Sequence, residues 1–130
     1  MSESSTLLYL VEDEPLLAEL ISANLQKAGY RLEIFQDPLL AYAAFESADP
    51  KPALVITDFN MPGMNGIQFL ERCKALMPAL KTICMSGTVT PDILGRFDTK
   101  PDTVLSKPCP ARLLLSAVAR LVSGEGGPRV

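Results

Sequence analysis

Histidine is absent from this chain of 130 residues, so no imidazole is available as a metal ligand. Cysteine is scarce: Cys73, Cys84 and Cys109 are an odd number, at spacings that match neither a zinc site nor a CxxC redox motif. We therefore expect reduced thiols, with Cys84 in a buried strand, as is typical of a cytosolic protein. Any metal site in this chain would have to be built from oxygen atoms.

Long apolar runs are missing too. No stretch approaches the ~18 apolar residues that a membrane span requires. The first residues, 1–5, lack the basic start and the apolar core of a signal peptide. These absences predict a cytoplasmic protein with no membrane partner.

Clustered basic charge is the third absence. The chain has 12 Lys and Arg residues against 15 Asp and Glu, which gives a net charge of −3, and its basic residues are scattered. Because nucleic-acid binding needs grouped basic side chains to neutralise phosphates, we expect no nucleic-acid partner.

The composition is that of one globular domain, with 48% hydrophobic and 21% charged residues. We expect this domain to span residues 6–122. It would leave a disordered start over 1–5 and a flexible, glycine-rich tail over 123–130.

Short apolar runs alternate with segments of helical periodicity along the chain. Runs of this length, bounded by turn residues, are typical of strands covered on both faces. They occupy residues 6–11, 31–35, 53–57, 80–85 and 102–105. A first helix is expected over 15–27, with Gly29 as its stop. Its apolar face is expected to hold Leu16, Leu17, Leu20, Ile21 and Leu25.

Capping residues mark the next two helices. Asp37 and Pro38 open a helix through Phe45, and Asn65 caps one that ends before Pro78. The side chains of the latter helix that we expect to point inward are Ile67, Phe69, Leu70 and Cys73. The aromatic residues that fit core positions are Tyr9, Phe35, Phe45 and Phe69.

Weaker signals complete the pattern. Thr90 and Pro91 start a fourth helix that Gly95 and Pro101 limit to about two turns. Pro110 opens a last helix, and the stripe that it buries is expected to contain Leu113, Leu114, Ala117, Val118 and Leu121. Strands and helices that alternate in this way predict an α/β fold, a parallel sheet with helices on both faces and right-handed crossovers.

Acidic side chains follow two of the expected strands. Glu12 and Asp13 come directly after the run 6–11, and Asp58 comes after 53–57. Because the carboxyl ends of parallel strands meet at one edge of a sheet, we expect these carboxylates to converge. Two carboxylates about 4 Å apart repel by ~4 kcal/mol at an effective dielectric constant of about 20, so three together call for a cation or shifted pKa values. Oxygen ligands without thiolate or imidazole favour Mg²⁺.

A carboxylate beside Mg²⁺ indicates phosphoryl chemistry. Asp58 is placed to act as a nucleophile that forms an acyl phosphate. The incoming group would need a cation and hydrogen-bond donors for its oxygens. Ser86 follows the fourth expected strand and Lys107 the fifth, so both should face the same edge.

Four short motifs therefore stand at the ends of the expected strands. In chain order they are Glu12-Asp13, Asp58 followed by Phe59-Asn60-Met61-Pro62-Gly63, Ser86-Gly87 and Lys107-Pro108. In this order and spacing they resemble the receiver domain of bacterial response regulators, and the resemblance covers residues 6–121. It implies a flavodoxin-like (βα)5 fold with a doubly wound, five-stranded parallel sheet of order 2-1-3-4-5.

The resemblance also implies how the carboxylates would act. Asp58 would accept a phosphoryl group from a phosphohistidine of a histidine kinase or histidine phosphotransfer protein. Asp13, Asp58 and the backbone carbonyl of Asn60 would bind Mg²⁺ directly, whereas Glu12 would act through bound water.

Two further residues would link this chemistry to an output. Lys107, whose bond to Pro108 is cis in the family, would pair with Asp58 and later with the phosphoryl group. The Ser86 hydroxyl would move to donate a hydrogen bond to that group. The movement would change the surface around the fourth helix, the fifth strand and the fifth helix, and so regulate a downstream protein partner. A weak homodimer is left open. The resemblance implies a signalling domain rather than an enzyme with a separate substrate.

The chain departs from the family pattern in the output region. Val104 stands where the family often has an aromatic residue, so an aromatic switch is not available there. Residues 98–102 replace the usual Gly-Ala pair, and the fourth helix is short. With these departures the chain resembles receivers that belong to hybrid sensor kinases or stand alone. It resembles receivers that drive a DNA-binding domain less.

Each of these residues has an ordinary structural explanation when taken alone. Acidic residues after a strand suit the N-terminus of a helix, and Asp58 could cap a loop. Ser86 before a glycine suits a turn, and Lys107 could be a solvated charge. Only the joint arrangement favours a functional site.

Other functional classes share parts of the pattern. A nucleotide- or flavin-binding module needs a glycine-rich first turn, where this chain has Glu12-Asp13-Glu14-Pro15. An aspartate-based phosphohydrolase would carry a second acid two residues after its nucleophile, at the position of Asn60. The remaining alternative is a pseudo-receiver, a protein-interaction module that is never phosphorylated.

Overall fold

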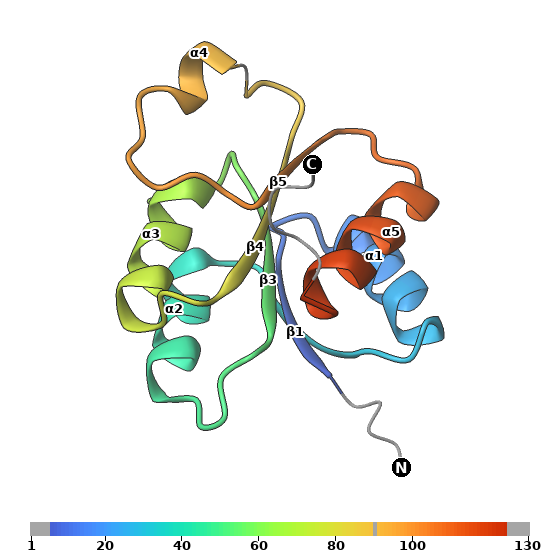
Figure 1. Ribbon diagram of the computed structural model, residues 1–130. Helices are drawn as coiled ribbons and strands as arrows, with labels where there is room; N and C mark the ends of the chain where they lie inside the picture. The colour runs from blue at the N-terminus through green and yellow to red at the C-terminus, as the bar shows by residue number, and fades with distance from the viewer. Residues whose placement is uncertain (1–5, 90, 125–130) are drawn as a thin grey trace.

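Five short parallel strands form the centre of the molecule (Figure 1). The structure is a computed structural model and describes residues 6–89 and 91–124. The strands are β1 (Leu7–Val11), β2 (Arg31–Phe35), β3 (Leu54–Asp58), β4 (Lys81–Ser86) and β5 (Thr103–Ser106). They pair in the order β2-β1-β3-β4-β5, which confirms the predicted fold class and strand order. The expected disordered start, 1–5, and most of the expected tail, 125–130, lie outside the described residues.

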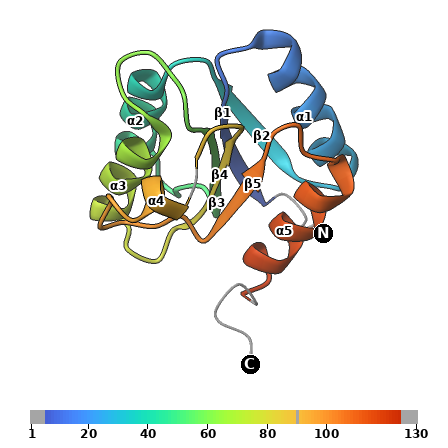
Figure 2. The same ribbon diagram turned by 90° about the horizontal axis from the view of Figure 1, so that it is seen from above.

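Helices cover both faces of this sheet. They are α1 (Pro15–Lys27), α2 (Pro38–Ser47), α3 (Gly66–Leu76), α4 (Pro91–Leu94) and α5 (Ala111–Val122). The helices α1 and α5 lie together on one face, and α2 and α3 lie on the other (Figures 1 and 2). Within residues 6–89 and 91–124, none of these helices is long and apolar enough to cross a membrane.

Two hydrophobic cores fill the space between the sheet and its helices. Leu8 and Leu10 of β1 pack with side chains of α1 and α5, whereas Tyr9 and Val11 pack with side chains of α2 and α3. Successive strand side chains point to opposite faces, so a strand covered twice must be apolar throughout. Of the aromatic residues predicted for the core, Tyr9, Phe45 and Phe69 are buried in the second cluster, and Phe35 is partly buried and packs against it.

The predicted caps of α2 and α3 are confirmed. The Asp37 side chain accepts a hydrogen bond from the backbone N–H of Leu39. At α3, Asn65 accepts from the backbone N–H of Gln68, whose side chain accepts in return from the backbone N–H of Asn65. Such reciprocal caps satisfy N–H groups that the first turn of a helix leaves unpaired. They fix where each helix begins after its loop.

The predicted buried faces of α1 and α5 are partly wrong. Leu16 and Leu20 are 83% and 61% exposed, and the buried residues of α1 are Ala18, Ile21, Ser22 and Leu25. At 3.6 residues per turn, positions 16 and 20 lie roughly opposite that face, so the predicted set covered too wide an arc. Leu113 of α5 is likewise exposed at the side of its buried stripe.

The fourth helix is shorter than the two turns predicted. The helix α4 covers four residues, and the expected start at Thr90 lies outside the described residues. In the segment that follows α4, the ring of Phe97 lies edge-on to Phe59 at 6.4 Å between centroids. Further along, the Asp102 side chain accepts a hydrogen bond from the Thr82 backbone N–H at 2.8 Å.

Candidate functional site at the carboxyl edge of the sheet

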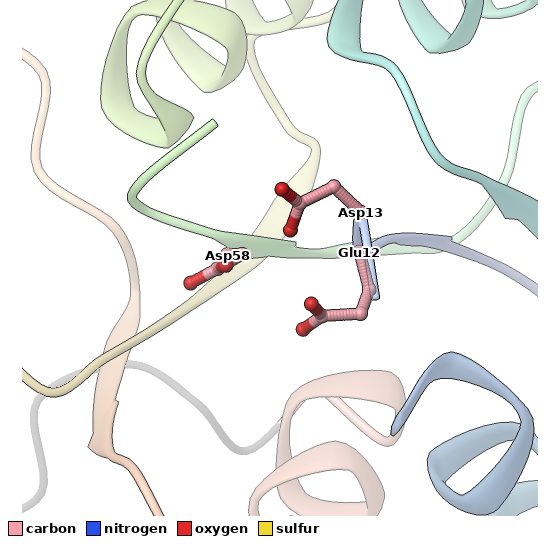
Figure 3. A group of neighbouring side chains, drawn as sticks. All are labelled: Glu12, Asp13 and Asp58. Atoms are coloured by element: carbon pink, nitrogen blue, oxygen red, sulfur yellow. The ribbon is translucent and has the colours of Figure 1, made fainter. Parts of the chain in front are cut away.

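Three carboxylates meet where β1 and β3 end (Figure 3). The parallel register pairs Val11 with Thr57, so the residues that follow them lie side by side. One carboxylate oxygen from each of Glu12, Asp13 and Asp58 lies within 4.8 Å of the other two. The convergence expected from the strand ends is therefore present.

The three carboxylates differ in their exposure to solvent. Glu12 is 2% exposed and Asp58 is 7% exposed, whereas Asp13 is exposed at the surface. Burial raises the pKa of Glu12, and the charge of Asp58 raises it further. Hydrogen bonds from the Glu14 backbone N–H and from Lys107 oppose this rise but do not cancel it. Burial therefore outweighs the hydrogen bonds that favour the charged form of Glu12.

Lys107 brings a positive charge to these carboxylates. Its Nζ lies 3.2 Å from Glu12 Oε1 and 3.3 Å from Asp58 Oδ2. Burial alone would lower the pKa of this lysine, but its interactions with Glu12 and Asp58 raise it above the ordinary value. Contact with Asp58 was expected, and the contact with Glu12 was not. The bond from Lys107 to Pro108 is cis, as the resemblance implied.

The position of Lys107 follows from the end of β5. Its backbone N–H donates to the Ser86 carbonyl at 3.0 Å, which extends the pairing of β4 and β5 by one residue. The side chain can then reach across β4 to the ends of β1 and β3, which lie in the middle of the sheet. A lysine one residue earlier would point to the opposite face.

Gly66 supports the backbone of the acceptor loop, and sequence reasoning did not identify it. A Cβ built at this position would lie 2.2 Å from the Asp58 carbonyl oxygen, where no side chain fits. The Gly66 N–H donates to the Phe59 carbonyl at 2.8 Å, so α3 begins directly against the loop that carries Asp58. The glycine that follows the Asn65 cap was the available signal for this contact.

Ser86 is 4% exposed, and its hydroxyl is engaged with its own loop. The Oγ atom accepts from the backbone N–H groups of Thr88 at 2.9 Å and Val89 at 3.1 Å. It also lies 3.2 Å from the Thr88 hydroxyl, which accepts from the Asn60 side chain at 3.0 Å. These contacts connect the loop after β4 to the loop after β3.

The donor set at this edge fits Mg²⁺. The carboxylates supply hard oxygen ligands from two strands, and Asp13 leaves one side of the cluster open to water and ligands. The neighbouring ammonium group could pair with an anion that enters from this side. A site of this kind can hold a cation and a phosphoryl group together.

A doubly wound parallel sheet with its polar site at the carboxyl edge defines the flavodoxin-like class of α/β proteins. Residues 8–119 match the family model described as the response regulator receiver domain. The chain therefore belongs to the response regulator receiver domain family, whose members act in two-component signalling.

Curated relatives carry the same domain in chains of different length. The chain is 31% identical over 120 residues to the response regulator receiver protein CpdR of Brucella abortus, covering 88% of this chain and 95% of that one. It is 35% identical over 123 residues to the response regulator protein FleR of Pseudomonas aeruginosa, covering 89% of this chain and 24% of that one. For the DNA-binding response regulator MtrA of Mycolicibacterium smegmatis, identity is 29%, with 93% of this chain and 53% of that one covered.

Solved structures confirm the fold. The signal receiver domain of a signal transduction histidine kinase from Syntrophus aciditrophicus is 26% identical, with a TM-score of 0.83 and 96% of each chain covered. A CheY-like receiver domain protein from Methanospirillum hungatei JF-1 is 22% identical, with a TM-score of 0.85, covering 93% of this chain and 96% of that one.

Proposed function

We propose that this receiver domain is a phosphorylation-controlled switch that accepts a phosphoryl group on Asp58. The observation that carries the proposal is the meeting of three carboxylates and one ammonium group at the carboxyl edge of the sheet. The phosphodonor would be a phosphohistidine on a histidine kinase or a histidine phosphotransfer protein. This role makes the domain a signalling partner that promotes only its own phosphorylation and dephosphorylation.

Asp58 is the nucleophile in this proposal. One of its carboxylate oxygens attacks phosphorus, the new O–P bond forms, and the N–P bond of the phosphohistidine breaks. The imidazole of the donor leaves with the electron pair of that bond and takes up a proton from water. Because Asp58 is 7% exposed, a donor must approach along the open side beside Asp13.

The residues proposed to hold Mg²⁺ are Asp13, Asp58 and the backbone carbonyl of Asn60, with Glu12 acting through water. When bound, Mg²⁺ supplies positive charge that neutralises the phosphoryl oxygens. Glu12 also keeps Lys107 in place, since Lys107 Nζ lies 3.2 Å from Glu12 Oε1.

Lys107 and Ser86 are the proposed responding residues. Lys107 Nζ lies 3.3 Å from Asp58 Oδ2, a distance from which it can exchange that carboxylate for a phosphoryl oxygen. Ser86 would release its loop contacts and donate its hydroxyl hydrogen to another phosphoryl oxygen. The loop after β4 would then shift, and the surface around α4, β5 and α5 would present a different shape to a downstream protein.

Intact-protein mass spectrometry tests the proposal directly. We expect acetyl phosphate with Mg²⁺ to add one phosphoryl group to the wild type. The wild type without Mg²⁺ and the Asp58→Asn variant with Mg²⁺ should gain none. Asp98→Asn, which removes an exposed carboxylate outside the site, should leave the gain unchanged. A folded wild type that binds Mg²⁺ without any gain would overturn the proposal and favour a pseudo-receiver. An equal gain in Asp58→Asn would exclude Asp58 as the main acceptor.

A further inference from the structure

The hydroxyl of Ser86 has a fixed direction in this structure. A serine hydroxyl offers two acceptor lone pairs and one donor hydrogen. Both acceptor positions are used, because the backbone N–H groups of Thr88 and Val89 donate to Ser86 Oγ at 2.9 and 3.1 Å. The remaining contact of 3.2 Å, between Ser86 Oγ and Thr88 Oγ1, therefore has Ser86 as its donor.

Thr88 is held in place to receive this hydrogen. Its Oγ1 also accepts from Asn60 Nδ2 at 3.0 Å, so both of its own acceptor positions are used. Asn60 belongs to the loop after β3, two residues beyond Asp58, whereas Thr88 belongs to the loop after β4. The side chain of Thr88 thus bridges the two loops that border the site.

We infer that Thr88 is a positioning residue that retains the Ser86 hydroxyl hydrogen while Asp58 is unmodified. This inference rests on the proposed function, in which Ser86 must donate that same hydrogen to a phosphoryl oxygen. One hydrogen cannot serve both acceptors. Thr88 Oγ1 therefore competes with the phosphoryl group for the Ser86 hydroxyl hydrogen. Asn60 favours Thr88 in this competition because its hydrogen bond orients the Thr88 hydroxyl. Occupation of the site has to break the Ser86–Thr88 contact.

The competition predicts tighter binding of a phosphoryl mimic when the competitor is removed. The probe is beryllofluoride with Mg²⁺, a mimic of the aspartyl phosphate, with its dissociation constant measured by NMR titration. Thr88→Val has nearly the same shape but lacks the hydroxyl, and the exposed position tolerates it. We expect Thr88→Val to bind the probe about two- to tenfold more tightly than the wild type, the range set by one hydrogen bond.

Thr88→Ser is the matched control, because it restores the hydroxyl while removing the methyl group. We expect its dissociation constant to stay within about twofold of the wild type. Tightening in Thr88→Ser equal to that in Thr88→Val would overturn the inference, as would unchanged or weaker binding by Thr88→Val. Absence of binding by the folded wild type would instead overturn the proposed function itself.

The bridge can also be observed without the probe. In the free protein, the side-chain amide signals of Asn60 should shift in Thr88→Val and should stay near their wild-type positions in Thr88→Ser. Identical Asn60 signals in all three proteins would show that Thr88 Oγ1 does not accept from Asn60, and the inference would fail.

Discussion

Lys107 and Glu12 meet in the centre of the site although 95 positions separate them in the chain. The Nζ atom of the lysine lies 3.2 Å from Oε1 of the glutamate, which is almost fully buried. The lysine therefore stabilises a buried carboxylate in addition to its proposed part in phosphoryl binding. Its replacement should affect both the stability of the fold and the response to phosphorylation.

Lys107→Ala should lower the free energy of unfolding by about 1–3 kcal/mol, because Glu12 and Asp58 lose their cation. Urea unfolding of the wild type and of this variant gives the value. Glu12→Gln removes the charge that needs pairing, so the double variant should lose less than the sum of the two single changes. Strictly additive losses would contradict an interaction between these two side chains.

Gly66→Ala should disturb the acceptor loop, because the added Cβ would lie 2.2 Å from the Asp58 carbonyl oxygen. We expect a loss of about 1–3 kcal/mol in stability together with slower phosphorylation by acetyl phosphate. Gly87→Ala is the control, since the nearest atom to its Cβ would be the Lys107 carbonyl oxygen at 3.8 Å, an ordinary contact. Equal effects of the two substitutions would show that the close approach at Gly66 affects neither stability nor phosphorylation more than an ordinary contact does.

Mg²⁺ should stabilise the fold, because it would bind carboxylates that repel one another. At a concentration one hundred times its dissociation constant, a ligand of the native state adds about 2.7 kcal/mol to the free energy of unfolding. Thermal unfolding with and without Mg²⁺ measures this gain. We expect Asp13→Asn to lose most of it, whereas Asp98→Asn should keep it. A full gain in Asp13→Asn would remove Asp13 from the proposed ligands.

Alkaline pH should destabilise the fold through the buried thiols. Burial raises the pKa of Cys73 and of Cys84 to about 12, whereas unfolded thiols ionise near 9.0. Above pH 9 the native state then binds more protons than the unfolded state, so the free energy of unfolding falls as pH rises, by up to about 1.4 kcal/mol per pH unit for each thiol. Urea midpoints between pH 8 and 10 measure this slope.

Cys84→Ala is the matched variant for that experiment. It removes one of the two thiols, so its stability should depend less steeply on pH in the same range, even though the cavity lowers stability at every pH. An unchanged slope would mean that other groups cause the alkaline loss.

The alternation of strands and helices and the meeting of Glu12, Asp13 and Asp58 could be predicted because both follow from local patterns. The order of the strands was implied by the resemblance to the receiver family and is confirmed. Apolar runs mark buried strands, and the residue after each run must reach the carboxyl edge of a parallel sheet. The family membership was also predictable, since four short motifs fall at those ends. The proposed roles of these residues stay predictions, to be tested by the experiments above.

Other features of the site depend on distances that no local pattern contains. The Glu12–Lys107 pair joins the first and last strands of the chain order, and the approach of Gly66 to the Asp58 carbonyl depends on the angle at which α3 leaves its loop. The exposure of Leu16 was mispredicted for a related reason. Leucine at a helix position indicates an apolar side chain, but the packing of α1 against the sheet and α5 decides which arc is covered.

The placement of the three cysteines leaves one of them accessible for selective labelling. Two thiols lie inside the second core and are held in their protonated form, whereas Cys109 is partly exposed two residues after Lys107. A maleimide or a fluorinated alkylating reagent at mildly alkaline pH should therefore modify the folded protein at one position only. A reporter group attached there would lie within the connection between β5 and α5. Occupation of the site could then be followed spectroscopically without introducing or deleting a cysteine.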